Sequence, residues 1–376
     1  MRTKALLSSR AGNERRLALR SVIGVLAAHC MMAGAMSNET FISTAMVEVE
    51  ARNDFWREAT RPVFDTMPLS PDSKEPLEGA ISSRPLGSIA IGTVSFNGQR
   101  YIRDHRTIVH SDLDYYLIQL FTSGKMNGDF NGLGVRADVG DICFLDLSKA
   151  FKSEVDAGSR ISLAVSRRDL EKVIGPRSLH GVVLRGDQPM TRLIATYLKG
   201  IRSLERSLSP VEALASEEAL IALLAGAVKG DALESLEDYP SMSIALRQRV
   251  LAFIDQNIGE QELSPELIQQ KLRVSRSHLY RAFAEDGGVA KIIRDRRLDE
   301  AFKQLTKPSK QSRSVRQIAY SLGFSSGNQL LRGFRARFDM TPKEAQIERE
   351  RLQFERQANN DLHGYFTEIL NRTVKS

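Results

Sequence analysis

An internal repeat in the C-terminal third limits the possible folds of this chain more than any other feature of its sequence. Residues 272–283 (LRVSRSHLYRAF) and 322–334 (LGFSSGNQLLRGF) both contain Leu-x-x-Ser and then Leu-x-Arg-x-Phe, and the second copy is one residue longer. A short apolar-periodic segment precedes each copy and follows Ser264 or Ser314, where serine is a favourable helix N-cap. The repeat therefore predicts two units, each made of two helices joined by a tight turn.

The second helix of each unit is expected to have one apolar and one polar face. Leu279 and Phe283 are four residues apart, and Leu330 and Phe334 repeat this spacing, so these side chains should face inward. The opposite face is rich in Arg, Ser and Asn, and a helix of this kind fits the major groove of DNA. The predicted DNA-binding residues are Arg276, Ser277, His278, Tyr280, Arg281, Ser326, Asn328, Leu331, Arg332 and Arg335.

Residue chemistry assigns roles within this predicted surface. Arginine donates paired hydrogen bonds to base edges or phosphates, so Arg281 and Arg332 are the first candidates for either contact. The apolar Leu331 lies on this face where a polar residue would be expected, and a thymine methyl group is its alternative partner. The alternative for each arginine is an exposed side chain that only adds positive potential. Predicted base contacts are Ser277, Tyr280 and Asn328, and predicted phosphate contacts are Arg276, Ser326 and Arg335.

The positive charge of the chain is concentrated in the same region. The whole sequence has a net charge of +7, whereas residues 241–346 hold 19 Lys and Arg against 11 Asp and Glu, a net charge of +8. A basic third attached to a nearly neutral remainder indicates that one part meets a polyanion while the other does something else. A basic module that binds nucleic acid without sequence preference remains the alternative function, and it predicts steep salt dependence.

Residues 245–346 resemble the DNA-binding domain of the AraC/XylS family of transcription regulators. Arg297-Leu298-Asp299-Glu300-Ala301 is similar to the family's linker helix, and IAYSLGFSS followed by RFDMTP is similar to its signature. The resemblance implies a seven-helix domain whose two recognition helices enter successive major grooves about 34 Å apart. It also implies a sequence-specific regulator, more often an activator, with double-stranded DNA and RNA polymerase as partners.

The sequence departs from the family pattern at several positions. Gln269 replaces a small Ala, Arg273 and Asp339 replace Gly, and Ala345 replaces Tyr, while Ala319 and Gly323 keep the pattern in the second unit. These differences leave the expected fold unchanged. They bear instead on which side chains contact DNA, above all at Gly327 and Leu331.

The region before the repeat is expected to form a cupin-like β-barrel with helices, which makes the whole chain an α+β multidomain protein. Residues 53–64 are predicted to be a short helix, and short strand-like runs separated by turns occupy residues 81–166. Phe55-Trp56-Arg57, the segment 103–106 and Val139-Gly140-Asp141 resemble the AraC-binding-like domain of one branch of the family. That resemblance implies a small-molecule effector and dimerisation through the helices of this domain.

A heptad-like seam follows the predicted strands. Apolar side chains recur at alternating steps of four and three residues, which is typical of a helix that packs along one edge. A seam between two copies of the chain and a helix packed within its own domain are equally compatible with the pattern. The candidate dimerisation residues are Met190, Ile194, Tyr197, Ile201, Leu204 and Leu208.

No metal, cofactor or catalytic residue is predicted, and the chain is not expected to be an enzyme. A metal-binding cupin needs clustered His and carboxylate ligands, whereas His105 and His110 are five residues apart. On the expected strand, an odd separation would point them to opposite faces. Cys143 lies in an apolar run and is expected to be a buried thiol. A cupin-type enzyme remains a lesser alternative.

The first residues allow two interpretations. A basic stretch precedes the apolar residues 21–36, as in a secretory signal. The favoured interpretation is a disordered extension or a start assigned too far upstream, with Met36 or Met46 as the true start. The cysteines, Cys30 and Cys143, cannot build a disulfide framework, so a cytoplasmic protein without a membrane segment is expected; export is the alternative. The predicted divisions are 1–45 (extension), 46–232 (sensor and dimerisation), 241–346 (DNA binding) and 347–376 (tail), with a linker near 229–241.

Overall fold

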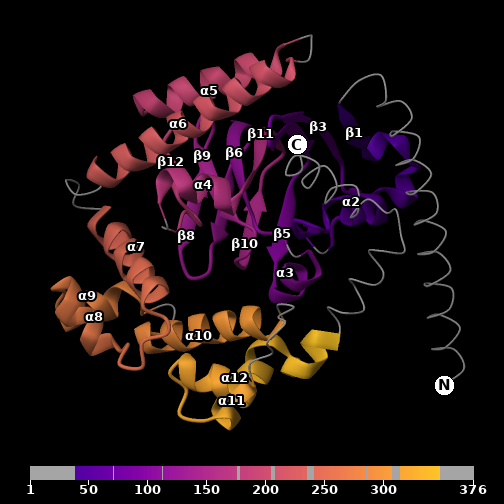
Figure 1. Cartoon of the computed structure of the whole chain (residues 1–376). Helices are drawn as coiled ribbons and strands as arrows, with labels where there is room; N and C mark the ends of the chain where they lie inside the picture. Colours follow the sequence, from indigo (N-terminus) through magenta and orange to yellow (C-terminus); the bar gives the residue numbers. More distant parts are fainter. Residues whose placement is uncertain are drawn as a thin grey trace, which may run out of the picture.

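The computed structural model in Figure 1 describes residues 39–70, 72–111, 113–175, 178–204, 208–234, 241–284, 287–306 and 314–347. The signal-like residues 1–36 lie outside these ranges, as does all but the first residue of the predicted tail. Within the described ranges, every helix is too short or too polar to span a lipid bilayer.

Two antiparallel sheets form the N-terminal domain. The larger has the strand order β1-β3-β4-β11-β6-β9-β12 and the smaller has the order β2-β5-β10-β7-β8. The domain has the predicted cupin-like character, but the two sheets are not closed into a barrel, which corrects that part of the prediction. The strands are β1 (Thr40–Ser43), β2 (Asp65–Pro68), β3 (Gly79–Leu86), β4 (Ile89–Phe96), β5 (Gln99–Arg103), β6 (Tyr115–Ser123), β7 (Met126–Asp129), β8 (Gly134–Ala137), β9 (Ile142–Asp146), β10 (Phe151–Val155), β11 (Gly158–Ser166) and β12 (Val183–Leu184).

Alternation along the strands gives the larger sheet two different faces. Ile161, Leu163 and Val165 of β11 are buried in a core shared with the helices α4, α5 and α6. Arg160 and Ser162 point to the other face, toward the smaller sheet. The helices of this domain are α2 (Arg52–Thr60), α3 (His105–Ser111), α4 (Arg167–Ile174), α5 (Pro189–Arg202) and α6 (Pro210–Glu234), with short 3-10 turns at Thr44–Met46 and Val49–Ala51.

Two of the predictions for this domain were wrong. Residues 105–111 form α3 rather than a strand, because Asp104 accepts hydrogen bonds from the backbone nitrogen and the hydroxyl of Thr107 and so caps a helix. His105 and His110 therefore lie on one helix. The predicted linker is also shorter than expected, since α6 continues to Glu234 and the next helix begins at Ser241.

The C-terminal domain is helical and is built around α10. Figure 1 shows α8 and α9 near one end of α10 and α11 and α12 near the other. Val289 and Ile293 of α10 are buried with the first pair, whereas Leu298 and Phe302 are buried with the second. One helix thus supplies core residues to both units. The helices are α7 (Ser241–Gln256), α8 (Pro265–Leu272), α9 (Arg276–Ala282), α10 (Val289–Thr306), α11 (Val315–Ser321) and α12 (Gly327–Phe338).

Candidate nucleic-acid interface

The two repeat units align at the caps of their second helices. Ser275 accepts a hydrogen bond from the backbone nitrogen of His278 at 3.3 Å, and Ser326 accepts one from that of Gln329 at 3.2 Å. Each cap lies four residues before a fully buried leucine, so α9 and α12 begin in the same register. The extra residue of the second copy, Ser325, falls in the turn.

The first helix of each unit also begins where the sequence predicts. Ser264 accepts a hydrogen bond from the backbone nitrogen of Leu267, and Ser314 forms a reciprocal capping box with Gln317. Arg273, which ends α8 where the family favours Gly, has a left-handed backbone with φ of 54°. In the second unit Gly323 fills the corresponding turn with φ of 70°, a conformation that glycine adopts without strain.

Arg297, a residue of α10, forms hydrogen bonds to both units. Its guanidinium donates hydrogen bonds to the carbonyl oxygen of Glu260, before α8, at 2.6 Å and to that of Gly323, after α11, at 3.2 Å. A Cβ atom at Gly323 would lie 2.6 Å from the guanidinium carbon of Arg297. The arginine of the Arg-Leu-x-x-Ala segment is therefore a structural clamp, and a side chain at position 323 would displace its guanidinium.

The predicted contact residues form an exposed surface on α9 and α12. Tyr280 is 48% exposed and Leu331, at the matching position, is 38% exposed. The guanidinium of Arg276 lies 5.3 Å from the ring of Tyr280, so the two side chains support each other. Only Ser326, whose hydroxyl caps α12, is half-buried. The exposed members are Arg276, Ser277, His278, Tyr280, Arg281, Asn328, Leu331, Arg332 and Arg335.

Arg337 differs from the other arginines of α12. It forms paired hydrogen bonds with Asp299 of α10 at 2.7 and 2.9 Å and approaches Asp295 at 3.3 Å. Burial alone would lower the pKa of Arg337, but the two carboxylates raise it instead. This arginine fixes α12 on α10, while Arg332 and Arg335 remain exposed to solvent.

Sequence reasoning missed a further candidate contact on α11. Arg316 and Tyr320 are exposed, four residues apart, and the guanidinium lies 5.7 Å from the ring. The Cα atom of Arg316 lies 3.8 Å from a Cβ atom built at Gly327, the first residue of α12. This places a positive side chain beside the start of the second recognition helix. The spacing of an arginine and an aromatic residue on one helix face was the signal that could have revealed it.

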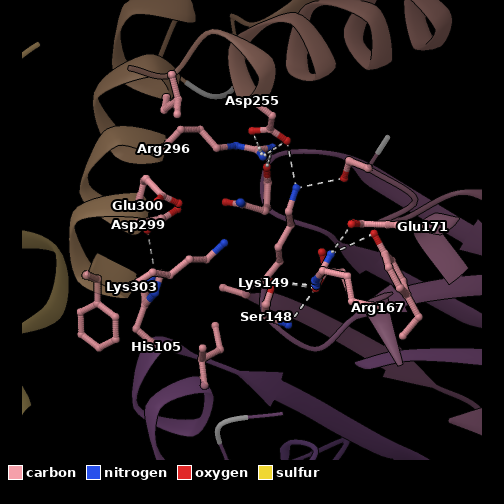
Figure 2. A pocket seen from close by; sticks show the side chains of 18 residues that line it. His105, Ser148, Lys149, Arg167, Glu171, Asp255, Arg296, Asp299, Glu300 and Lys303 are labelled. Carbon is pink, nitrogen blue, oxygen red and sulfur yellow. Dashed lines mark hydrogen bonds and ion pairs between the residues drawn. The ribbon is translucent and has the colours of Figure 1, made fainter. Parts of the chain in front are cut away.

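A polar junction joins the N-terminal domain to the helical domain. Asp255 of α7 accepts hydrogen bonds from Lys149, in the turn after β9, at 2.9 Å and from Arg296 of α10 at 2.6 and 2.9 Å. Burial would raise the pKa of Asp255, but the two cations lower it, so this carboxylate is ionised. Figure 2 shows the three side chains converging from three elements.

A second contact of the junction involves α3. The Nε2 atom of His105 lies 3.3 Å from the carboxylate of Asp299, the residue that also binds Arg337. The His105 ring packs edge-on against Phe338 with centroids 4.4 Å apart. Burial lowers the pKa of His105 below its ordinary value, because the negative charge of Asp299 offsets only part of the effect of burial. Residues of both contacts line a cavity of about 230 Å³ (Figure 2).

The comparisons with known proteins agree with this architecture. A model of the AraC-binding-like domain matches residues 56–231, and a model of a helix-turn-helix domain matches residues 268–346. A curated relative from Bacillus sp. (strain OxB-1), "Uncharacterized protein in nit 5'region", is 25% identical over 241 residues, which are 61% of this chain and 90% of the relative.

Several solved structures show distant similarity to this chain. The AraC-like transcriptional activator CuxR is 21% identical, with a TM-score of 0.47 over 71% of this chain and 96% of its own. ToxT from Vibrio cholerae O395 is 15% identical, with a TM-score of 0.30 over 69% of this chain and 98% of its own. A regulator from Chromobacterium violaceum is 33% identical, with a TM-score of 0.25 over 27% of this chain and 88% of its own.

The fold and the exposed repeat define a two-domain regulator with a double helix-turn-helix. The two domain matches together cover more than half of the sequence, in the order that this architecture requires. The chain belongs to the AraC/XylS family of transcriptional regulators. Its predicted identity as a DNA-binding regulator is thereby confirmed.

The candidate dimerisation seam divides into buried and exposed parts. Ile194 and Ile201 are buried in the core between α5, α6 and the larger sheet, which corrects their assignment to an intermolecular contact. Tyr197 and Leu208 pack against that core, and the Tyr197 hydroxyl donates to the carbonyl oxygen of Ser216 on α6. Met190 and Leu204 are the exposed members of the seam.

No metal site is formed by the described residues. Among them, no three His, Cys, Asp or Glu side chains are grouped to hold an ion. His105 instead contacts Asp299 and Phe338, and His180 is buried between two backbone groups. Cys143 is a free, buried thiol whose pKa burial raises to about 12.

Proposed function

We propose that α9 and α12 read two neighbouring stretches of the DNA major groove. The observation that carries this proposal is the common register of two exposed recognition helices held on one helix, α10. Each offers an arginine at the same position after its cap, Arg281 and Arg332, with other polar side chains around it. Arginine can bind guanine through two donors, and the remaining arginines set the register on phosphates.

Selection of bound sequences from a random DNA pool tests the proposal. The full-length protein would be used at physiological salt with competitor DNA. We expect a motif with two different half-elements about one helical turn apart. Binding without any enriched motif, fading steeply as salt rises, would instead show a non-specific module.

The N-terminal domain is the proposed sensor of a small organic effector. We propose that effector binding changes how the helical domain is held through Lys149, Asp255 and Arg296. These three side chains lie on the sensor, on α7 and on α10, so a shift of the turn that bears Lys149 reaches both units. The same proposal makes the protein a cytoplasmic activator that contacts RNA polymerase, as is usual for its family.

We also propose that two copies associate through the outer face of α5 and α6. Leu193 of α5, Leu204 after the end of α5, and Val211 and Leu214 in the first turns of α6 are exposed. The terminal carbon of Met190 lies 3.5 Å from a Cβ atom built at Gly226, which shows that the two helices are adjacent. Exposed apolar side chains of this number on one helical hairpin favour a protein partner.

Sedimentation of the full-length protein tests the association. Leu193→Glu should convert a dimer to a monomer, because it places a charge on the apolar face. Asn127→Glu, at an exposed polar position of β7 on the smaller sheet, is the control for an added charge and should leave the mass unchanged. A monomeric unsubstituted protein at micromolar concentration would contradict the proposal.

A further inference from the structure

Arg160 is buried between the two sheets of the sensor domain. It lies on β11, opposite Val94 of β4 and Phe121 of β6, and only 2% of it is exposed. Its guanidinium carbon lies 4.6 Å from the centroid of Phe96 and 4.2 Å from that of Phe121. A cation has thus been placed in the apolar core, enclosed by aromatic rings.

The guanidinium of Arg160 is not satisfied by its surroundings. Its Nε and Nη2 atoms are buried and have no hydrogen-bond partner among the described residues. Burial lowers the pKa of Arg160 to about 10, so the side chain still carries its charge at neutral pH. A buried charge without a partner is costly, and such groups call for a functional explanation.

A second buried arginine of the same domain shows the contrast. Arg103 is 1% exposed and donates hydrogen bonds to the carbonyl oxygens of Pro62, Val63 and Leu147 and to the hydroxyl of Ser111. Its guanidinium is thus hydrogen-bonded by groups of the protein itself. Arg103 is therefore a structural residue, whereas the donors of Arg160 are left for something else.

The inter-sheet face around Arg160 has further polar groups. Ser162 follows on the same face of β11 and accepts a hydrogen bond from Gln119 of β6 at 3.2 Å. Ser153, on the opposing sheet, is 3% exposed, and its hydroxyl also has no partner among the described residues. Tyr101 of that sheet packs edge-on against Phe96, with ring centroids 6.0 Å apart. Polar groups from both sheets therefore meet an apolar core.

We propose that Arg160 binds the carboxylate of a small organic acid, which enters between the sheets as the effector. This inference rests on the proposed sensor function. The Nε and Nη2 donors of an arginine lie side by side and match the two oxygens of a carboxylate. Phe96 and Phe121 supply the apolar contacts for the remainder of the molecule. Because the two sheets share no strand, their separation can change without breaking a strand pair.

The single tryptophan of the chain provides a direct measurement. Trp56 is fully buried, and its indole nitrogen donates to the side-chain oxygen of Gln99 at 3.0 Å. The same oxygen accepts from the Tyr101 hydroxyl at 3.0 Å, so a molecule beside Tyr101 should change the Trp56 fluorescence. Benzoate and hexanoate would be titrated into the full-length protein, with benzamide and hexanamide as neutral counterparts.

We expect saturable binding of at least one acid and weaker binding of its amide. Arg160→Gln should weaken binding of the acid by about tenfold to a hundredfold, since a hydrogen bond to a charged group is lost. Arg160→Lys should bind with intermediate affinity, and thermal unfolding would confirm that each variant is folded. Arg100→Gln removes a half-buried arginine that pairs with Glu154 at the surface of β5 and should bind as the unsubstituted protein does.

Three results would overturn the inference. They are amide binding as tight as acid binding, unchanged acid binding by folded Arg160→Gln, and no fluorescence or thermal shift with either acid. The DNA selection described above separates this failure from that of the proposed function. A recovered motif without acid binding overturns only the ligand assignment, whereas acid binding without a motif overturns only the DNA-reading function.

Discussion

The arginines of this chain have three kinds of surroundings, which distinguish them better than their sequence positions do. Arg297 and Arg337 bind backbone carbonyls or carboxylates within the helical domain. Arg332 is exposed on the repeat surface, and Arg160 is buried without a hydrogen-bond partner for two of its nitrogens among the described residues. Substitution of one arginine should therefore affect stability, DNA binding or ligand binding according to its surroundings.

Removal of the Arg332 side chain should weaken binding to the selected DNA site by about 1–3 kcal/mol and relax the preference at one base position. The reason is that a paired contact to a base edge is lost while the fold is kept. Competition binding against single-base variants of the site measures both effects. Arg249→Ala removes an exposed arginine from α7 and is the control for charge. An equal loss on every sequence would assign Arg332 to a phosphate.

His180 should make the sensor domain less stable in acid. Its Nδ1 atom accepts from the backbone nitrogen of Asp146 and its Nε2 faces the carbonyl oxygen of Ala150, which fixes a neutral ring. Burial lowers the pKa of His180 from 6.5 to about 3. The stabilisation is thus complete above pH 6.5 and is lost as the pH falls toward 3.

The free energy of unfolding should consequently be about 2 kcal/mol lower near pH 5 than near pH 7. Urea denaturation followed by Trp56 fluorescence measures this difference for the sensor domain. His180→Gln should reduce the difference, although His105, whose pKa is also lowered, contributes with the same sign. The same pH dependence with and without His180 would contradict the assignment.

The helices of the repeat were predictable from the sequence because local signals and long-range packing agree there. Serine caps, apolar spacing and the turn residues all indicate the same boundaries for α8, α9, α11 and α12. The short strands were also predictable from their alternation. At residues 105–111 the apolar pattern favoured a strand, but Asp104 caps a helix there and the segment forms α3.

The seam on α5 shows why a pattern does not identify its partner. Steps of four and three residues describe one face of a helix, and that face can pack on another chain or on its own domain. Here α6 and the larger sheet cover Ile194 and Ile201. The sequence could not reveal that two nitrogens of Arg160 lack partners. The pairing of β11 with β4 and β6 brings the rings of Phe96 and Phe121 to the guanidinium, and this pairing is known only from the structure.

Loss of the Arg297 clamp should loosen the spacing between the two half-elements of the DNA site. Arg297→Met keeps the length of the side chain but removes its hydrogen bonds to Glu260 and Gly323. The variant should distinguish less strongly between the selected site and a site with one base pair inserted between its halves. Arg294→Met, at an exposed position of α10, is the control, and equal discrimination by both variants would contradict a clamping role.

At the scale of the whole molecule, the junction between the domains carries the proposed regulation. Lys149 belongs to the sensor, yet its ammonium group binds a carboxylate of α7 that also binds α10. The His105 ring in turn contacts Asp299 of α10 and Phe338 of α12. The sensor therefore touches the scaffold of both units and leaves the predicted DNA-binding residues exposed.

Lys149→Met should separate effector sensing from DNA binding. The variant loses the cation that joins the sensor to Asp255, so it should bind the selected DNA site but show a reduced change in affinity when effector is added. Lys152→Met, at an exposed position of β10, is the matched control. DNA-binding titrations with and without effector provide the measurement. A full effector response in Lys149→Met would place the coupling elsewhere, for example at His105.

The shared helix α10 has a consequence for the promoters that such a protein can serve. Its two ends hold units with different proposed reading residues, Ser277 and Tyr280 on one and Asn328 and Leu331 on the other. We therefore expect a single copy to recognise a sequence that is not its own reverse complement. Inversion of the site in the chromosome would reverse the orientation of the bound protein. The orientation of each site should therefore determine toward which of the two flanking genes the protein faces.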